Sequence, residues 1–114
     1  MVMTAHHIVP DALLDRVAQR FRVLGDASRL AIVRLLVDRG ESSVGEVVDR
    51  VGMSQANVSK HLRLLLDAGI VSRRREGTSA YYSVVDTSVE RLCALVCDRI
   101  EEQVQLEAAA LSGV

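Results

Sequence analysis

The sequence has very few aromatic residues, with two tyrosines, one phenylalanine and no tryptophan among 114 residues. Hydrophobic residues nevertheless make up 49% of the chain, so its core must be built from small aliphatic side chains. A chain of this length holds one domain, or a small domain and one additional helix that contacts a partner. A small aliphatic core favours a helical fold that completes its hydrophobic interior by dimerising.

Cysteines and long apolar runs are also scarce. Cys93 and Cys97 are too few and too close in sequence to form a disulfide framework, which is typical of a reducing compartment. No apolar run approaches the roughly 20 residues that cross a membrane, and residues 1–10 lack the charged-then-apolar order of a signal peptide. We therefore expect a cytoplasmic protein with no membrane partner. Residues 1–10 are expected to form a disordered arm, in which His6 and His7 offer only a weak pair of metal donors.

The net charge of −1 weighs against a nucleic-acid partner, but the charges are distributed unevenly. Residues 1–53 contain seven arginines and seven acidic residues. Residues 54–85 contain five basic and two acidic residues, for a net charge of +3. Residues 86–114 contain two basic and six acidic residues, for a net charge of −4. Positive charge is thus concentrated in one segment, as expected if that segment alone contacts phosphates.

Hydrophobic residues at the helical period predict three short helices in the first half of the chain. Asp11 and Asp26 are the expected N-caps of the first two, and Ser43 and Glu46 fit a capping box at the start of the third. The predicted helices cover residues 11–24, 26–39 and 44–51. The predicted buried stripe of the second helix consists of Leu30, Val33, Leu36 and Val37.

Residues 54–69 predict a fourth helix, with Ser54 as N-cap and Gly69 closing its C-terminus in the left-handed conformation. One face is apolar and consists of Val58, Leu62, Leu65 and Leu66. The opposite face carries Gln55, Asn57, Ser59, Lys60 and Arg63. Because amides, hydroxyls and cations hydrogen-bond to base edges and phosphates, and residues 52–54 form the turn of a helix-turn-helix, we interpret this as a DNA recognition helix. Ser54 is expected to touch phosphate as well. The alternative is that these polar residues form an ordinary solvated face. His61 lies at the edge of the apolar face and is expected to be packed and hydrogen-bonded.

After Gly69 the period changes to two, which predicts strands over residues 70–75 and 79–84 and hence a hairpin wing beside the helix. Arginines 73, 74 and 75 alternate sides, so Arg73 and Arg75 share one side and are the expected DNA contacts. A long helix then begins at Asp86 or Thr87. Its apolar stripe has little remaining core to cover it and predicts a dimer interface formed by Val89, Leu92, Cys93, Val96, Cys97, Ile100 and Val104.

Four segments in this order resemble the ArsR/SmtB family of winged-helix transcriptional repressors. They are LGDASRLAI at residues 24–32, SQANVSKHL at 54–62, LDAGIV at 66–71, and the wing from REG at 75–77 to the tyrosine pair at 81–82. The resemblance covers about residues 13–105. It implies a homodimer packed through its first and last helices, binding to an operator with two-fold symmetry, and weaker binding when an inducer is present.

The inducer is the open question, and the two cysteines are the first candidates. Cys93 and Cys97 lie four residues apart on one helix face, a spacing that suits arsenite or a soft metal. Two thiolates do not complete a tetrahedral site, so a third ligand from elsewhere or from the partner subunit would be needed. The alternative, which we favour, is that both are small apolar residues of the dimer stripe.

The sequence departs from the metal sites that the resemblance implies. The third helix lacks the Cys-x-Cys site of thiol-rich sensors. Of the acid and histidine site used for zinc, Asp86 and Glu102 are retained, but Ser88 and Arg99 occupy the expected histidine positions. Because an arginine cannot ligate zinc, we expect this site to be lost, and a thiophilic metal or metalloid inducer is a hypothesis.

No pattern of an enzyme is present, since the chain lacks a phosphate-binding Gly loop, a Gly-x-Ser-x-Gly elbow and a His-Glu-x-x-His helix. We predict a mainly α-helical winged helix-turn-helix domain over residues 11–108, with a small β-hairpin wing, that dimerises through its first and last helices. Its expected function is transcriptional repression by binding double-stranded DNA as a homodimer, with release by a metal, metalloid or thiol-reactive inducer. The alternative is a winged-helix module whose arginine-rich wing binds an acidic protein.

Overall fold

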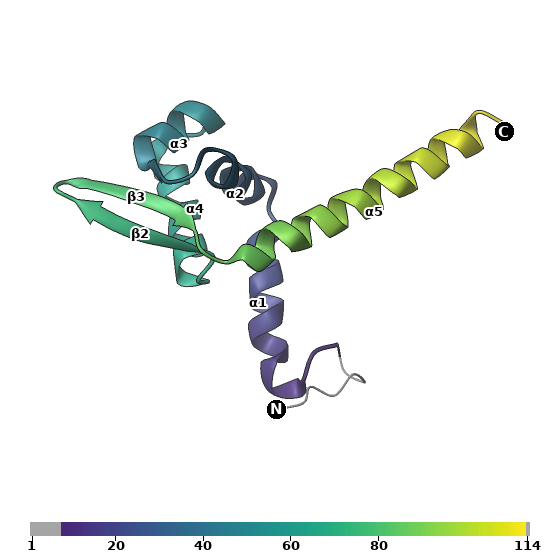
Figure 1. Ribbon diagram of the computed structural model, residues 1–114, viewed down its shortest axis with the longest axis horizontal. Coiled ribbons are helices and arrows are strands. Elements are labelled where there is room, and N and C mark those ends of the chain that lie inside the picture. Colours follow the sequence, from purple (N-terminus) through teal and green to yellow (C-terminus); the bar gives the residue numbers. More distant parts are fainter. Residues whose placement is uncertain (1–7, 114) are drawn as a thin grey trace.

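The computed structural model describes residues 8–113, so most of the predicted N-terminal arm lies outside the described residues. A 3-10 turn over Asp11–Leu13 leads into the helices and strands shown in Figure 1. The helices are α1 (Leu14–Leu24), α2 (Ala27–Arg39), α3 (Val44–Val51), α4 (Gln55–Asp67) and α5 (Thr87–Leu111). The strands are β1 (Ser42–Ser43), β2 (Val71–Glu76) and β3 (Ser79–Val84).

Side-chain caps begin four of these helices. Asp26 accepts a hydrogen bond from the Arg29 backbone N–H at 3.0 Å, and Ser43 and Glu46 form the predicted capping box. Ser54 caps α4 and Asp86 caps α5 in the same way, so these four predicted starts are confirmed. The cap predicted at Asp11 is wrong: Pro10 is extended and Asp11 lies inside the 3-10 turn, so α1 begins later and without a side-chain cap.

The predicted hairpin is confirmed, and a third short strand joins it. The sheet is antiparallel with the order β1-β3-β2, and Ser42 and Ser43 pair with Tyr82 and Tyr81. Sequence periodicity misses β1 because two residues are too short to show any alternation. The strand anchors the wing to the start of α3, and its Ser42 is buried.

The core lies between α2, α3, α4, the end of α1, the start of α5 and the base of the hairpin, and it is aliphatic as expected. Its members are Val23, Leu24, Ile32, Val33, Leu36, Val47, Val58, Leu62, Leu65, Ile70, Val71, Tyr82 and Val89. One predicted member of the α2 stripe is wrong, since Leu30 is 38% exposed whereas Ile32 is fully buried. The two side chains point to nearly opposite sides of the helix, because two helical steps turn the chain by about 200°.

Helices α1 and α5 project away from this core in different directions (Figure 1). Both keep apolar side chains exposed, and these include Leu14, Phe21, Leu95, Val96, Ile100, Val104, Leu106 and Leu111. An apolar surface of this extent marks an interaction site. Among the described helices, none is both long enough and apolar enough to cross a membrane.

Candidate nucleic-acid interface

Because one face of α4 is buried in the core, the side chains on its opposite face point to solvent. Val58, Leu62 and Leu65 have no exposed surface, so they hold the helix against the core. The five polar residues predicted to contact DNA are all exposed, namely Gln55, Asn57, Ser59, Lys60 and Arg63. The amphipathic division predicted for this helix is therefore confirmed, and its hydrogen-bonding groups face away from the protein.

Both ends of α4 are closed by local hydrogen bonds. The Ser54 hydroxyl accepts the Asn57 backbone N–H at 3.2 Å. At the other end the Ile70 N–H donates to the Leu65 carbonyl and the Gly69 N–H donates to the Leu66 carbonyl, each at 3.0 Å. This pair of bonds is a Schellman motif, which requires the positive φ of 75° that Gly69 adopts. The predicted boundaries of the recognition helix are thus confirmed to within two residues.

The two cations of α4 differ in their surroundings. Arg63 pairs with Asp67 one turn later, with Nε and Oδ1 3.1 Å apart, and both side chains are more than half exposed. Such surface pairs are weak, so Arg63 can exchange this carboxylate for a phosphate at little cost. Lys60 is exposed and takes part in no ion pair within residues 8–113.

His61 points away from this polar face and links α4 to the start of α2. Its Nδ1 lies 3.2 Å from a guanidinium nitrogen of Arg29, and Arg29 also donates to the Val23 carbonyl at 2.5 Å. Because arginine only donates, the Nδ1 of His61 acts as the acceptor. The backbone N–H of Arg29, and then its charge, hold the pKa of Asp26 below its usual value. The prediction that His61 is packed and hydrogen-bonded is confirmed.

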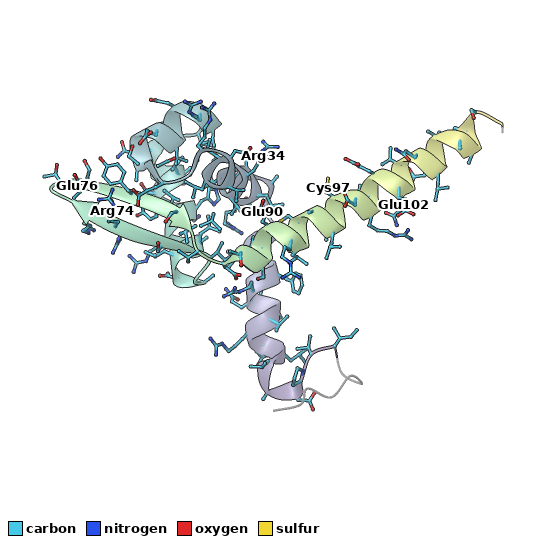
Figure 2. All side chains as sticks on the ribbon, in the orientation of Figure 1. Arg34, Arg74, Glu76, Glu90, Cys97 and Glu102 are labelled. Carbon is cyan, nitrogen blue, oxygen red and sulfur yellow. The ribbon has the colours of Figure 1, made fainter. Side chains whose placement is uncertain are left out.

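Arg74 is held on the wing by two carboxylates and a tyrosine. It donates to Glu41 at 2.8 Å and to Glu76 at 2.5 Å, and its guanidinium lies 4.8 Å from the centre of the Tyr81 ring. Hydrogen bonds from Arg74 keep the pKa of Glu41 low. Figure 2 shows Arg74 and Glu76 along the hairpin. This cluster secures the wing to the segment before β1 and leaves Arg74 little freedom to contact DNA.

Arg73 and Arg75 lie on the other face of β2. They pair across the strands with Tyr82 and Ala80, and they share a face with the buried Val71. Both arginines are exposed, and neither forms an ion pair with another residue of the described range. The division predicted among the three wing arginines therefore agrees with their surroundings, while their contact with DNA stays a prediction.

The thiols lie on α5, partly outside the core. Cys93 is half-buried against the core, and Cys97 is exposed farther along the helix (Figure 2). The Cys97 Sγ lies 3.7 Å from a carboxylate oxygen of Glu101, whose negative charge raises the pKa of the thiol. Within residues 8–113, no group of three histidine, cysteine or acidic side chains is arranged to hold a metal.

The residues at the zinc-type positions are engaged with other protein groups and do not fit a zinc site. Asp86 pairs with Arg20 and accepts hydrogen bonds from the backbone and hydroxyl of Ser88. Arg99 pairs with Glu102 at 3.5 Å. Each carboxylate already has a guanidinium partner, and Ser88 and Arg99 offer no imidazole at the positions where the resemblance implies histidines, so this donor set does not suit zinc.

Comparison with known proteins points to the family that the sequence resembles. Residues 26–73, from the cap of α2 into β2, match the sequence model described as "Bacterial regulatory protein, arsR family". The chain is 42% identical to a probable mercury resistance operon repressor of Streptomyces lividans, over 76% of this chain and 69% of the relative. It is 34% identical to the arsenical resistance operon repressor of Bacillus subtilis, over 73% of this chain and 84% of the relative.

A solved structure agrees in fold as well as in sequence. The solution structure of a homodimeric winged helix-turn-helix DNA-binding domain from Mycobacterium bovis is 37% identical, with a TM-score of 0.72 over 88% of this chain and 92% of that one. Its description names it a possible ArsR-family transcriptional regulator. The predicted fold and resemblance are confirmed: this chain belongs to the ArsR family of winged helix-turn-helix transcriptional regulators.

Proposed function

We propose that this protein is a homodimeric repressor that places α4 of each subunit in the major groove of a two-fold symmetric operator. The observation that carries the proposal is the division of α4 into a fully buried apolar face and an exposed face of amides, hydroxyls and cations. The homodimeric Mycobacterium bovis domain and the two operon repressors support the same assembly and role. Two-fold pairing places the two helices about one DNA turn apart, roughly 34 Å.

The side chains of α4 have distinct roles in this proposal. Lys60 and Arg63 contact phosphate or guanine, because both are exposed cations on the outer face. Gln55 and Asn57 contact adenine or phosphate through their amides. Ser54 caps the helix and, with Ser59, hydrogen-bonds to the DNA backbone. Arg73 and Arg75 bind the backbone from the wing.

Salt dependence tests this proposal against a protein-binding module. The full chain first selects duplexes from a random library, and binding to a selected duplex is then titrated with salt. A dimer making about 6–10 phosphate contacts should lose affinity steeply, by 10³–10⁵-fold between 50 and 200 mM salt. No selected duplex, or a flat response to salt, would favour an acidic protein partner instead.

The wing arginines provide a matched pair of variants within the same titration. Arg73→Ala or Arg75→Ala should reduce the magnitude of the salt slope by about one for each subunit that loses a phosphate contact. Arg74→Ala should leave the slope unchanged, because Glu41 and Glu76 already occupy its guanidinium. An equal change in all three variants would contradict the assignment of the wing face.

We further propose that the inducer is a thiophilic metal or metalloid bound through Cys93 and Cys97. Two observations support this: the relatives are named for mercury and arsenical resistance, and Cys93 and Cys97 lie one turn apart on α5, with Cys97 outside the core of its own subunit. The partner subunit or residues 1–7 would have to supply a third ligand. Since Glu101 raises the pKa of Cys97, binding must displace a proton and should strengthen as pH rises.

The double variant Cys93→Ser, Cys97→Ser is expected to bind the selected duplex normally and to lose release by arsenite or mercuric ion. Fluorescence anisotropy of labelled duplex measures both properties in one titration. If the double variant still releases DNA at the same concentration of arsenite and mercuric ion, the thiols are packing residues of the α5 stripe.

A further inference from the structure

Arg20 joins three elements that sequence reasoning treats separately. Its side chain leaves α1, donates one guanidinium nitrogen to the Asp86 carboxylate, and donates the other to the Ala68 carbonyl at 2.7 Å. Asp86 is the N-cap of α5 and Ala68 is the C-cap of α4. One side chain therefore connects the end of the recognition helix to both helices that project from the core.

Backbone contacts place the same two helix ends together. The Val85 and Asp86 N–H groups both point to the Ile70 carbonyl, at 3.0 and 3.4 Å. Gly69 lies between Ala68 and Ile70, and a Cβ at that position would be 3.6 Å from the Arg20 guanidinium. The last turn of α4 and the first turn of α5 thus meet at a junction that Arg20 fills from α1.

This junction sets the angle between α4 and the two helices α1 and α5, and that angle matters for a dimer on DNA. If α1 and α5 hold the two subunits together, the position of each α4 relative to those helices determines how far apart the two recognition helices lie. A displacement of one base-pair step, about 3.4 Å, is enough to move a recognition helix out of register with its half-site. We propose that Arg20 is a positioning residue that fixes the operator spacing this dimer accepts, an inference that rests on the proposed function.

Arginine suits this role because its planar fork presents separate donors in fixed directions. One nitrogen points to the carboxylate and another to the backbone carbonyl, so the side chain specifies an angle as well as a distance. The side chain is 41% exposed and that of Asp86 is 17% exposed. Because Asp86 is mostly buried, the pair is partly shielded from solvent, and breaking it costs about as much as losing one hydrogen bond to a charged group.

The test compares Arg20→Met with Arg22→Met on duplexes that differ only in half-site spacing. Arg22 lies on the same helix, and the side-chain hydrogen bond described for it goes to Gln19, also of α1, which makes it a matched control. A selected duplex and versions with one or two base pairs inserted or deleted between half-sites provide the probes. The unmodified protein and Arg22→Met should bind the selected spacing with about tenfold or more higher affinity than the altered spacings. A dimer can reach an altered spacing only by breaking the Arg20 contact, and one charged hydrogen bond is worth about this factor in affinity.

Arg20→Met should bind the selected spacing about tenfold more weakly and bind the altered spacings nearly as well as the selected one. Sedimentation and thermal unfolding check that the variant is a folded dimer. A purely structural role would lower affinity for every spacing by the same factor, and that result would overturn the inference. Failure of the unmodified protein to select any duplex would instead overturn the proposed function.

Asp86→Asn breaks the same contact from the other side, so the test can still be made if Arg20→Met does not fold. Asparagine is as good an N-cap as aspartate, so α5 keeps its start while the charge that holds Arg20 is removed. The same loss of spacing preference is expected. The double variant Arg20→Met, Asp86→Asn should lose no more than either single variant, because both changes break one junction. Fully additive losses would contradict the proposal.

Discussion

Ile100→Glu is expected to separate the dimer into monomers and to remove tight operator binding. Ile100 lies on the predicted stripe of α5 and is 51% exposed, with Val96 and Val104 one turn away on either side. In the proposed homodimer these side chains pack against the partner, and a buried carboxylate without a counter-ion is strongly unfavourable. Two half-sites held by one dimer bind far more tightly than one, so operator affinity should fall by about 10²–10⁴-fold.

Sedimentation equilibrium measures the change of assembly, and anisotropy with the selected duplex measures the change of affinity. Gln105→Glu is the matched control, because it adds the same charge to the same helix about 140° away from Ile100. The control should remain a dimer with unchanged affinity. An Ile100→Glu protein that stays dimeric and binds fully would show that the subunits meet through another surface.

Local features of the structure follow directly from the sequence. The caps at Asp26, Ser43, Ser54 and Asp86 are each made by a side chain within three residues of the donor, so short sequence patterns identify them. Alternation along β2 likewise distinguishes Arg74 from its two neighbours. The exposed stripe of α5 was predictable as well, because its apolar residues exceed what a small core can cover.

Contacts between distant residues could not be predicted in this way. Arg20 and Asp86 are 66 residues apart, and Arg74 and Glu41 are 33 apart. Each of these charges has many possible partners in a chain where a quarter of the residues are charged. Periodicity says which side of a helix a residue occupies but not which neighbour it meets. The buried face of α2 was mispredicted for a different reason: residues 30–37 are apolar at every position except Arg34, so periodicity does not distinguish Leu30 from Ile32, and packing buries Ile32.

Lys60→Ala is expected to weaken operator binding strongly without unfolding the protein. Lys60 is exposed and forms no ion pair within the described range, so alanine, a strong helix former, should change stability by no more than about 0.5 kcal/mol. Each lost DNA contact costs about 1–3 kcal/mol, and a dimer loses two, for about 2–6 kcal/mol in total. Arg63→Ala should act in the same direction, because its exposed pair with Asp67 is weak and exchanges for phosphate at little cost. Arg91→Ala removes an equal charge from α5 and should leave anisotropy titrations on the selected duplex unchanged. If Lys60→Ala and Arg91→Ala bound alike, the outer face of α4 would be a solvated surface, and the positive charge of residues 54–85 would act on DNA only through the wing.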